Sequence, residues 1–375
     1  NYNTASTGPL YNDPTAWYHF VWAFDMKNAT VGLRTQFYVN GIDHTSSLTT
    51  STAPAELVNL FDPSGSSIAI GYRLGQNTYM DGYIAEVHYI DGQQLHCGHF
   101  GEPDSDNPTI WRPKQYHGTY GANGLRLEFK QTGTSANSSG IGADTSGNDN
   151  HLSVTDLGAN CIMTESPNLT WATLSDIAAS DSQGAPGNIE NGGLRLPTGN
   201  KVHGLTLDNI MLDGGKWYWE VYMVTSNSFN STLGFRNNDN GDDDPSIEVE
   251  NDRQVKKDSS NEGSSGGNFA NGAIIGIKLD WSNTASRKVT FLYNNGAMSD
   301  AGETTFRDTG TNSGFRYHGR ETGTGSVQLY NFGQSPGFFG NLSAGGNSDA
   351  NGYGDFQYAV PSTYLSINSK NLATL

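Results

Sequence analysis

The stretch 215–222, Gly-Lys-Trp-Tyr-Trp-Glu-Val-Tyr, constrains the fold of this chain more than any other part of the sequence. In an extended strand, Trp217 and Trp219 point to one face, whereas Tyr218 and Tyr222 point to the other. Rings of this size are stable when most of their area leaves water. A strand with bulky rings on both faces needs cover on both faces, which predicts a sheet of a β-sandwich rather than a free hairpin.

Three later stretches have the same strand-like pattern. Residues 273–280 form an apolar run typical of a buried strand, residues 288–293 alternate, and residues 326–333 close the set. The second stretch is followed by Asn-Asn-Gly, in which the Asn295-Gly296 step predicts a hairpin turn. Together these stretches predict an antiparallel, all-β domain.

Taken in order, these stretches resemble a SPRY domain, which is a concanavalin-like β-sandwich. The resemblance spans residues 166–345, about half of the chain. Its features are Gly-Lys-Trp-Tyr-Trp-Glu at 215–220, Gly-Ile-Lys-Leu-Asp at 276–280, Phe-Leu-Tyr-Asn-Asn-Gly at 291–296, Asn-Phe-Gly-Gln at 331–334 and the nearby Phe338. This resemblance implies a domain that binds through its loops and has no catalytic activity.

Residues 1–100 contain a second series of predicted strands, at 17–25, 36–41, 67–71 and 82–90. In the first of them, Trp17, His19, Val21 and Ala23 share one face. The series Trp-Tyr-His, Tyr-Val-Asn-Gly, Ile-Gly and Gly-Tyr-Ile-Ala-Glu-Val resembles the second half of a laminin-G-like sandwich. A sandwich without its opening strands would expose half of its core. We therefore expect a longer protein, or another segment or subunit that supplies the missing strands.

Residues 101–165 are rich in Pro and Gly, which predicts a packed, loop-rich joint pinned by Trp111, Tyr116 and Tyr120, with a short strand at 125–129. Its succession of Phe-Gly-Glu, Trp-Arg-Pro-Lys-Gln-Tyr, Gly-Thr-Tyr-Gly-Ala-Asn-Gly and Asp-Thr-Ser-Gly-Asn-Asp-Asn is similar to a block in large tail or fibre proteins of marine phages. Residues 346–375 resemble the segment that leads into a further domain in those proteins. The resemblance implies tandem concanavalin-like, jelly-roll sandwiches in a virion protein.

The charge of the chain excludes some classes of partner. Lys and Arg number 21 against 38 Asp and Glu, so the formal net charge is −17. Binding to a phosphate backbone or an anionic membrane surface requires clustered cations, so neither nucleic acid nor membrane is expected as a partner.

No apolar run approaches the length of about 20 residues that spans a bilayer. Cys97 and Cys161 either form a single bridge or remain as two buried free thiols.

Three clusters could hold a metal. His96-Cys97-Gly98-His99 offers three ligands but lacks the fourth that zinc needs, so an ordinary linker is favoured. The acidic run at 239–244 could hold Ca²⁺ through Asp239, Asp242, Asp243 and Asp244, but it lacks the order of an EF-hand, and a solvated loop is favoured. Residues 144–150 are interpreted as an Asx-rich turn. We expect neither a metal nor a cofactor.

No catalytic pair can be assigned from the sequence. Residues 263–267 match Gly-x-Ser-x-Gly, but no predicted strand feeds the nucleophile elbow that this motif requires. Concanavalin-like glycanases carry Glu-x-Asp-x-x-Glu on one strand. The closest match begins at Glu250-Asn251-Asp252 and has Val255 where the second Glu belongs. These mismatches argue against an enzyme.

The tryptophans are the remaining candidates for a ligand site. Trp17, Trp22, Trp217 and Trp219 are expected in the cores, because they lie on predicted strands. Trp111, Trp171 and Trp281 lie near turns, where an indole could reach the surface and stack against a sugar.

The sequence therefore predicts a non-catalytic virion protein, a phage tail fibre or related appendage, that binds a host surface glycan or another virion protein. Location in the virion or outside the cell and a homo-oligomer, such as the trimer common among fibres, are expected from the resemblance. Two alternatives stay open: a glycan-degrading depolymerase of concanavalin-like fold, and a capsid-decorating or secreted adhesin.

Overall fold

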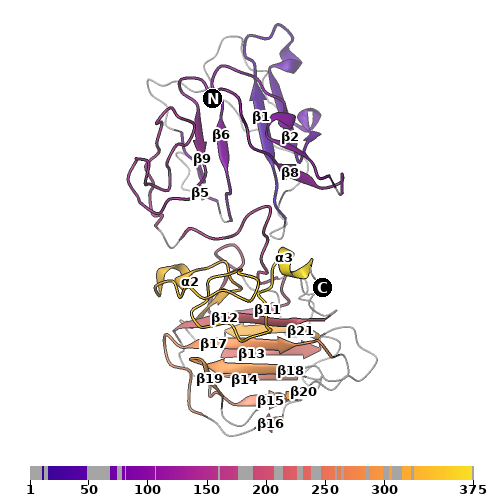
Figure 1. Ribbon diagram of the computed structural model, residues 1–375, viewed down its shortest axis with the longest axis vertical. Coiled ribbons are helices and arrows are strands. Elements are labelled where there is room, and N and C mark those ends of the chain that lie inside the picture. The colour runs from indigo at the N-terminus through magenta and orange to yellow at the C-terminus, as the bar shows by residue number, and fades with distance from the viewer. Residues whose placement is uncertain are drawn as a thin grey trace. The chain divides into compact units, whose positions relative to one another are not determined.

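The computed structural model describes residues 11, 16–48, 68–73, 78–80, 82–105, 107–158, 161–175, 189–206, 214–225, 231–237, 246–257, 260–262, 266–283, 288–298, 304–305, 315–321 and 325–373. The chain is all-β with antiparallel sheets, as predicted, and it divides into two compact units at Asp156 and Leu157 (Figure 1). The predicted joint at 101–165 is thus shared between the units, and the predicted tail at 346–375 belongs to the second unit. Among the described residues, no helix has the length and hydropathy needed to cross a membrane.

The second unit contains two antiparallel sheets packed face to face (Figure 1). The first sheet has the order β10-β22-β12-β17-β18-β19, with β20 also paired to β18. Its strands are β10 (Arg195–Leu196), β12 (Lys216–Thr225), β17 (Ile274–Asp280), β18 (Lys288–Tyr293), β19 (Gly296–Ala297), β20 (Thr304–Thr305) and β22 (Val327–Asn331). The predicted strands of the SPRY-like series are therefore confirmed and lie in one sheet.

The second sheet has the order β11-β21-β13-β14-β15-β16. Its strands are β11 (Asn200–His203), β13 (Ser231–Asn237), β14 (Ser246–Glu250), β15 (Val255–Lys257), β16 (Ser260–Glu262) and β21 (Phe315–Glu321). Aromatic rings fill the space between the sheets: Trp219 contacts Phe235 and Tyr317 edge-to-face at centroid distances of 6.1 and 5.8 Å. These contacts bury the inner faces of both sheets and make the unit a β-sandwich.

Strand β12 is buried on both faces, as its ring pattern predicts. Trp217, Trp219 and Val221 are 0% exposed, and Tyr218 on the opposite face is 1% exposed. The cover on the opposite face comes from residues after β22, where the Phe356 ring contacts Tyr218 at 5.4 Å between centroids. This segment also includes the short helices α2 (Gly337–Gly340) and α3 (Ser369–Leu372).

Turn chemistry sets the register of the hairpins. Between β18 and β19 the two central residues are Asn294 and Asn295, with φ of 46° and 66°. The turn expected at Asn295-Gly296 therefore lies one residue earlier, because Gly296 pairs with Tyr293 in the ladder. Two successive positive φ angles define a type I′ turn, and Asn tolerates both positions.

The first unit contains smaller antiparallel ladders (Figure 1). Strands β1, β2 and β3 form a three-stranded sheet, and the pairs β4–β5, β6–β9 and β7–β8 complete the described strands. Their bounds are β1 (Phe20–Phe24), β2 (Thr35–Val39), β3 (Ile42–Asp43), β4 (Tyr72–Arg73), β5 (Thr78–Tyr79), β6 (Val87–Tyr89), β7 (Gly101–Pro103), β8 (Trp111–Pro113) and β9 (Leu125–Leu127). The described residues of this unit also include the 3₁₀ helices η1 (Val31–Leu33), η2 (Thr45–Ser47) and η3 (Cys97–His99).

Two of the predicted strands differ from the structure. Residues 68–71 are not a strand and β4 begins after them, whereas the strand expected at 82–90 is limited to β6. The ladder that β6 forms with β9 pairs Val87 with Leu127 and Tyr89 with Leu125, and β9 is equally short. The length of β6 is therefore set by β9, a partner strand that lies far from it in the sequence.

The alternation predicted for β1 is correct, but Trp22 lies on the face opposite to that of Val21 and Ala23. Val21 and Ala23 are buried, at 7% and 5% exposure, whereas Phe20 and Trp22 are both 50% exposed. The expectation that Trp22 is a core residue is therefore wrong. On the same sheet face, Ile42 is 64% exposed opposite Val39.

Candidate functional site

An open hollow of about 470 Å³ lies in the first unit. One wall is the segment before and within η3, with Gln93, Leu95, Gly98 and His99, and the other is the segment after β8, from Lys114 to Thr119. Both segments belong to the unit's well-packed part, around Cys97, Phe100, Tyr116 and Tyr120. The hollow is therefore a fixed feature of the surface.

The first wall is shaped by a short capped turn. The imidazole Nδ1 of His96 accepts a hydrogen bond from the backbone N–H of Gly98 at 3.1 Å and so caps η3. Cys97 points into the core at 1% exposure, and His99, two residues on, is exposed toward the hollow. His96 thus caps a helix, Cys97 lies in the core and His99 lies at the rim of the hollow. The three side chains do not form a shared metal site.

The second wall follows the hairpin formed by β7 and β8. The backbone N–H of Lys114 donates to the carbonyl of Phe100 at 2.9 Å, which extends the hairpin pairing by one residue. This bond brings the 114–119 segment beside η3, although the two segments are separated in the sequence. The hairpin thus positions both walls.

The turn at the end of the second wall is pinned by side chains. The Tyr116 hydroxyl donates to the carbonyl of Thr119 at 3.1 Å, and Gln93 Nε2 donates to the same carbonyl at 2.9 Å. A Cβ at Gly118 would lie 2.2 Å from the Tyr116 hydroxyl oxygen, so a glycine is required there. Gln93 therefore joins the two walls directly.

A cluster of rings packs around Tyr116, which lines the hollow. Tyr116 contacts Phe100 and Tyr120 at centroid distances of 5.0 and 5.2 Å, and His88 contacts Phe100 at 5.3 Å. Tyr116 and Tyr120 are 8% and 9% exposed. Buried aromatic rings held by several neighbours change rotamer rarely, which gives the hollow a rigid floor.

A charged network anchors this floor to the ladder of β6 and β9. His88 lies between the Tyr120 hydroxyl, 2.8 Å from its Nδ1, and Glu86 Oε1, 3.3 Å from its Nε2. Arg126 Nε donates to the same Glu86 oxygen at 2.6 Å. The hydrogen bond with His88, aided by Arg126, lowers the pKa of Glu86 to about 2, and burial raises the pKa of Tyr120 to about 12.

The hollow itself carries binding groups and no acid–base pair. His99, Gln115 and His117 are exposed, and Lys114 Nζ lies 3.5 Å from Glu102 Oε2 at the edge. None of the described residues that line the hollow is Asp or Glu. The arrangement can donate hydrogen bonds and positive charge to a polar ligand, but it holds no carboxylate to act as nucleophile or general acid.

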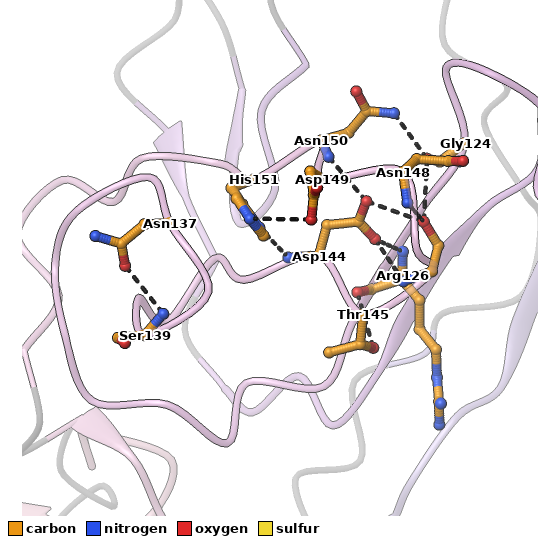
Figure 2. A network of polar contacts seen from close by, with 11 residues as sticks. Gly124, Arg126, Asn137, Ser139, Asp144, Thr145, Asn148, Asp149, Asn150 and His151 are labelled. Atoms are coloured by element: carbon orange, nitrogen blue, oxygen red, sulfur yellow. Dashed lines mark hydrogen bonds and ion pairs between the residues drawn. The ribbon is translucent and has the colours of Figure 1, made fainter.

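The predicted Asx-rich turn at 144–150 is confirmed and lies beside the ladder of β6 and β9 (Figure 2). Asp144 is 6% exposed, and its carboxylate accepts from the N–H groups of Arg126, Ser146 and Asn150 at 2.8–2.9 Å. These donors, with the Ser146 hydroxyl, lower the pKa of Asp144 against the effect of burial. With three N–H groups and one hydroxyl bound to its two oxygens, the Asp144 carboxylate has a structural role in this turn.

Two enclosed carboxylates in the second unit have the raised pKa that is typical of general acids. Burial raises the pKa of Glu220 and of Glu321 to about 7 in each case. Glu220 accepts from the backbone N–H groups of Gln357 and Tyr358 at 2.8 and 2.9 Å, and Glu321 accepts from Gln328 Nε2 at 2.8 Å. Both side chains are 0% exposed, so a substrate cannot reach them.

A further acid–base pair lies on the outward-facing side of the second sheet. His318 Nε2 is 3.9 Å from Glu248 Oε1, and Gly234 stands between these residues in the ladder. The two side chains are 2% and 4% exposed. A distance of 3.9 Å exceeds that of a hydrogen bond, and the burial keeps the pair from solvent.

The tryptophans predicted to reach a surface do not form a ligand platform. Trp171 and Trp281 are both 1% exposed, so the expectation that they reach the surface is wrong. Trp111 is half-buried, and its indole Nε1 donates to His19 Nδ1 at 2.8 Å. Its ring covers Gly41 and Gly101, where a Cβ would lie 2.4 Å away, so Trp111 pins the fold as predicted for the joint.

The other predicted sites gave mixed outcomes. Asp239, Asp242, Asp243 and Asp244 lie outside the described residues, as does part of the 263–267 motif. Within the described parts of the chain, no group of three or more His, Cys, Asp and Glu could hold a metal. Cys97 and Cys161 are free, the first buried and the second exposed, so they form no bridge and only one of them is buried.

Sequence reasoning missed the hollow because its residues have no periodic pattern. Gln93, Gln115 and His117 are polar residues in loops, which usually indicate only solvent exposure. The available signal was the pair Tyr116 and Gly118, since an aromatic residue two positions before a glycine in a Pro-rich segment can close a tight turn. Nothing in the sequence connected this turn with Gln93.

Comparisons with known proteins give limited likenesses. A scan against models of protein families found no match, and no curated protein matches the sequence. The SPRY domain of human HERC1 is similar at 15% identity, covering 38% of this chain and 90% of that domain, with a TM-score of 0.26. A protein of unknown function from Shewanella oneidensis MR-1 is similar at 15% identity, covering 44% of this chain and 80% of that one, with a TM-score of 0.23. At these values neither likeness identifies a function.

Proposed function

We propose that the chain is a non-catalytic structural and recognition protein of a virion, a phage tail fibre or related appendage. Its first unit binds a host surface glycan or another virion protein through the hollow between η3 and the segment 114–119. The observation that carries this proposal is the fixed, open shape of the hollow combined with its exposed polar side chains, His99, Gln115 and His117.

The geometry suits a sugar better than an apolar ligand. Sugars present hydroxyl groups that need hydrogen-bond partners, and the rim offers amide and imidazole groups for them. Sugar rings also present C–H faces, for which the half-buried side chain of Leu95 supplies apolar contact. Because the Tyr116 turn and the Gln93 bond fix both walls, binding loses little conformational entropy.

The burial of the carboxylates supports a non-catalytic role. Glycoside hydrolysis needs two carboxyl groups on opposite sides of a bound sugar, at a separation of roughly 5–9.5 Å. Glu220 and Glu321 are enclosed, and the hollow has no carboxylate among its described lining residues. The rival function, a glycan depolymerase, would require the release of reducing ends from a host polysaccharide.

The phage tail assignment rests on the sequence resemblance of residues 101–165 and of the two series of strands. Support for a homo-oligomer comes from three exposed apolar side chains on one face of the first sheet, Phe20, Trp22 and Ile42, which we call the aromatic face. Large apolar side chains that share one exposed sheet face usually mark an interaction surface. A second copy of the chain is the partner that a fibre would supply.

The test is binding of the whole protein to an array of host envelope glycans, with a Gln115→Ala/His117→Ala variant beside it. The proposal expects saturable binding by the wild type, at least tenfold weaker binding by the variant and no release of reducing ends. Release of reducing ends that stops after one Glu or Asp is changed would support the depolymerase. Antibody labelling of virions in micrographs separates a tail location from a capsid-decorating or secreted adhesin.

A further inference from the structure

The geometry points to an acidic glycan as the ligand of the hollow: we propose that the hollow selects sugars that carry a carboxylate, sulfate or phosphate group. This inference rests on the proposed glycan-binding function and specifies its substrate class. Lys114, His99 and His117 are the residues that would face the anionic group.

The charge of the lining differs from that of the whole chain. The chain has 38 acidic residues against 21 Lys and Arg, so its overall field repels an anionic ligand. The hollow brings together one lysine and two histidines, and none of its described lining residues is acidic. An acidic protein that holds an anion needs such a place, where a lysine and two imidazole donors lie together without a lining carboxylate.

Lys114 is available to a ligand. Its Nζ lies 3.5 Å from Glu102 Oε2, and the two side chains are 39% and 60% exposed. An exposed pair at this distance is weak, because water and salt screen it. The ammonium group has three donors, so it can retain Glu102 and still bind a ligand carboxylate or sulfate.

The positions of His99 and His117 follow from the packing of the two walls and not from hydrogen bonds of their own imidazole groups. The His99 ring contacts Tyr116 and Phe100 at centroid distances of 6.5 and 6.4 Å, which restricts its movement and leaves the ring exposed. His117 lies in the turn that Tyr116 closes, and it has no hydrogen bond or ion pair with any described residue. Both rings can therefore donate to an anion at the rim.

The size of the hollow favours an acidic sugar over a free inorganic anion. A volume of about 470 Å³ falls within the usual range of organic ligand sites and far exceeds the space of one sulfate or phosphate ion. Gln115 and Leu95 extend the lining beyond Lys114 and the two histidines, where the neutral part of a sugar would lie. The anionic group would then set selectivity while the ring supplies contact area.

The experiment compares matched glycans that differ only in charge. The whole protein is titrated with oligogalacturonides and with the same oligomers after methyl esterification, and an array adds sulfated and phosphorylated sugars with their neutral parents. The variants are Lys114→Met and His117→Gln. Lys27→Met is the control, since it removes an equal charge from an exposed position of the first unit outside the hollow.

The inference predicts binding at least tenfold tighter for acidic sugars than for their neutral partners. Lys114→Met should weaken acidic binding by about two- to fivefold, as expected for an exposed charged contact. His117→Gln should weaken it by a similar factor through the loss of an imidazole donor, and Lys27→Met should leave it unchanged. Equal binding to acidic and neutral partners would overturn the inference and leave the proposed glycan binding intact. Capture of a purified virion protein with no binding to any sugar would overturn this inference and the glycan as the ligand, and it would favour the virion-protein partner of the proposed function.

Discussion

The hydroxyl of Tyr116 donates to the carbonyl of Thr119 at 3.1 Å and closes the turn that forms one wall of the hollow. The same carbonyl accepts from Gln93 Nε2 of the opposite wall at 2.9 Å. One carbonyl oxygen thus joins two segments that are separated by 26 positions in the sequence. The shape of the candidate site depends on this pair of bonds.

Replacing Tyr116 by Phe should loosen the hollow without unfolding the first unit. The ring stays in the aromatic floor, and the Thr119 carbonyl keeps its bond from Gln93. Loss of one hydrogen bond should lower the free energy of unfolding by about 1 kcal/mol. Glycan binding, measured by titration, should weaken. Tyr79→Phe is the control, because Tyr79 is 70% exposed, and equal effects of both changes would contradict the role given to the Tyr116 hydroxyl.

Replacing Gly118 by Ala should have a larger effect. The new Cβ would lie 2.2 Å from the Tyr116 hydroxyl oxygen, so the ring or the turn must shift. We expect about 1–3 kcal/mol of destabilisation, as for other overpacked sites, together with loss of glycan binding. The matched control is Gly32→Ala, whose Cβ would meet nothing within 4 Å. Chemical denaturation shows the difference, and unchanged stability of Gly118→Ala would refute the close contact.

The stability of the second unit should fall as the pH rises from about 5 to 8. Burial raises the folded-state pKa of Glu321 to about 7, above the ordinary carboxyl value of 4.5. The folded state therefore retains a proton that the unfolded state releases, so this stabilisation is complete below pH 4.5 and is lost as the pH passes 7. The full loss is about 3 kcal/mol, because each pKa unit corresponds to about 1.4 kcal/mol.

Glu321→Gln tests this assignment. The amide can accept from Gln328 Nε2 and donate to the Ser231 hydroxyl, which now donates to Glu321 at 2.9 Å. Urea unfolding at pH 5 and pH 8 should therefore show a smaller pH dependence than in the wild type. Glu220→Gln is the contrasting variant, because its amide group would face backbone N–H donors and should destabilise the unit at both pH values. An unchanged pH dependence in Glu321→Gln would remove Glu321 as its source.

The aromatic face should control assembly. Trp22 and Phe20 are each 50% exposed, so Trp22→Ser should leave folding intact and raise the dissociation constant of the oligomer at least tenfold, as expected for a tryptophan at an interface. Light scattering over a concentration series measures this change. Leu157→Ser, at an apolar residue that is 45% exposed, is the control. A monomer at all concentrations in the wild type would rule out the homo-oligomer.

The β-sandwich could be predicted because the residues that indicate it are close together in the sequence. Trp217 and Trp219 alternate with Tyr218, and this pattern alone required cover on both faces of one strand. The turn at Asn40-Gly41 is another local feature, since both residues have positive φ, 48° and 80°, between β2 and β3. Asp144 also binds the backbone of its own turn, as Asx-rich sequences do.

The errors concern contacts between distant residues. Trp171 follows a turn, which suggested a surface position, but its ring lies against Gly333, where a Cβ would be 2.0 Å away. Trp22 lies on a predicted strand, which suggested a core position, but it is 50% exposed, whereas Val21 on the other face belongs to a buried cluster with Tyr38 and Phe100. The hollow depends on the bond between Gln93 and Thr119, which no local pattern indicates.

The most direct test of the account is binding of the whole protein to host envelope glycans, beside the Gln115→Ala/His117→Ala variant. The account predicts saturable binding by the wild type, a loss of at least tenfold in the variant and no release of reducing ends. Equal binding by both proteins would show that the hollow is not the site. Cleavage of the glycan by the wild type would contradict the non-catalytic role.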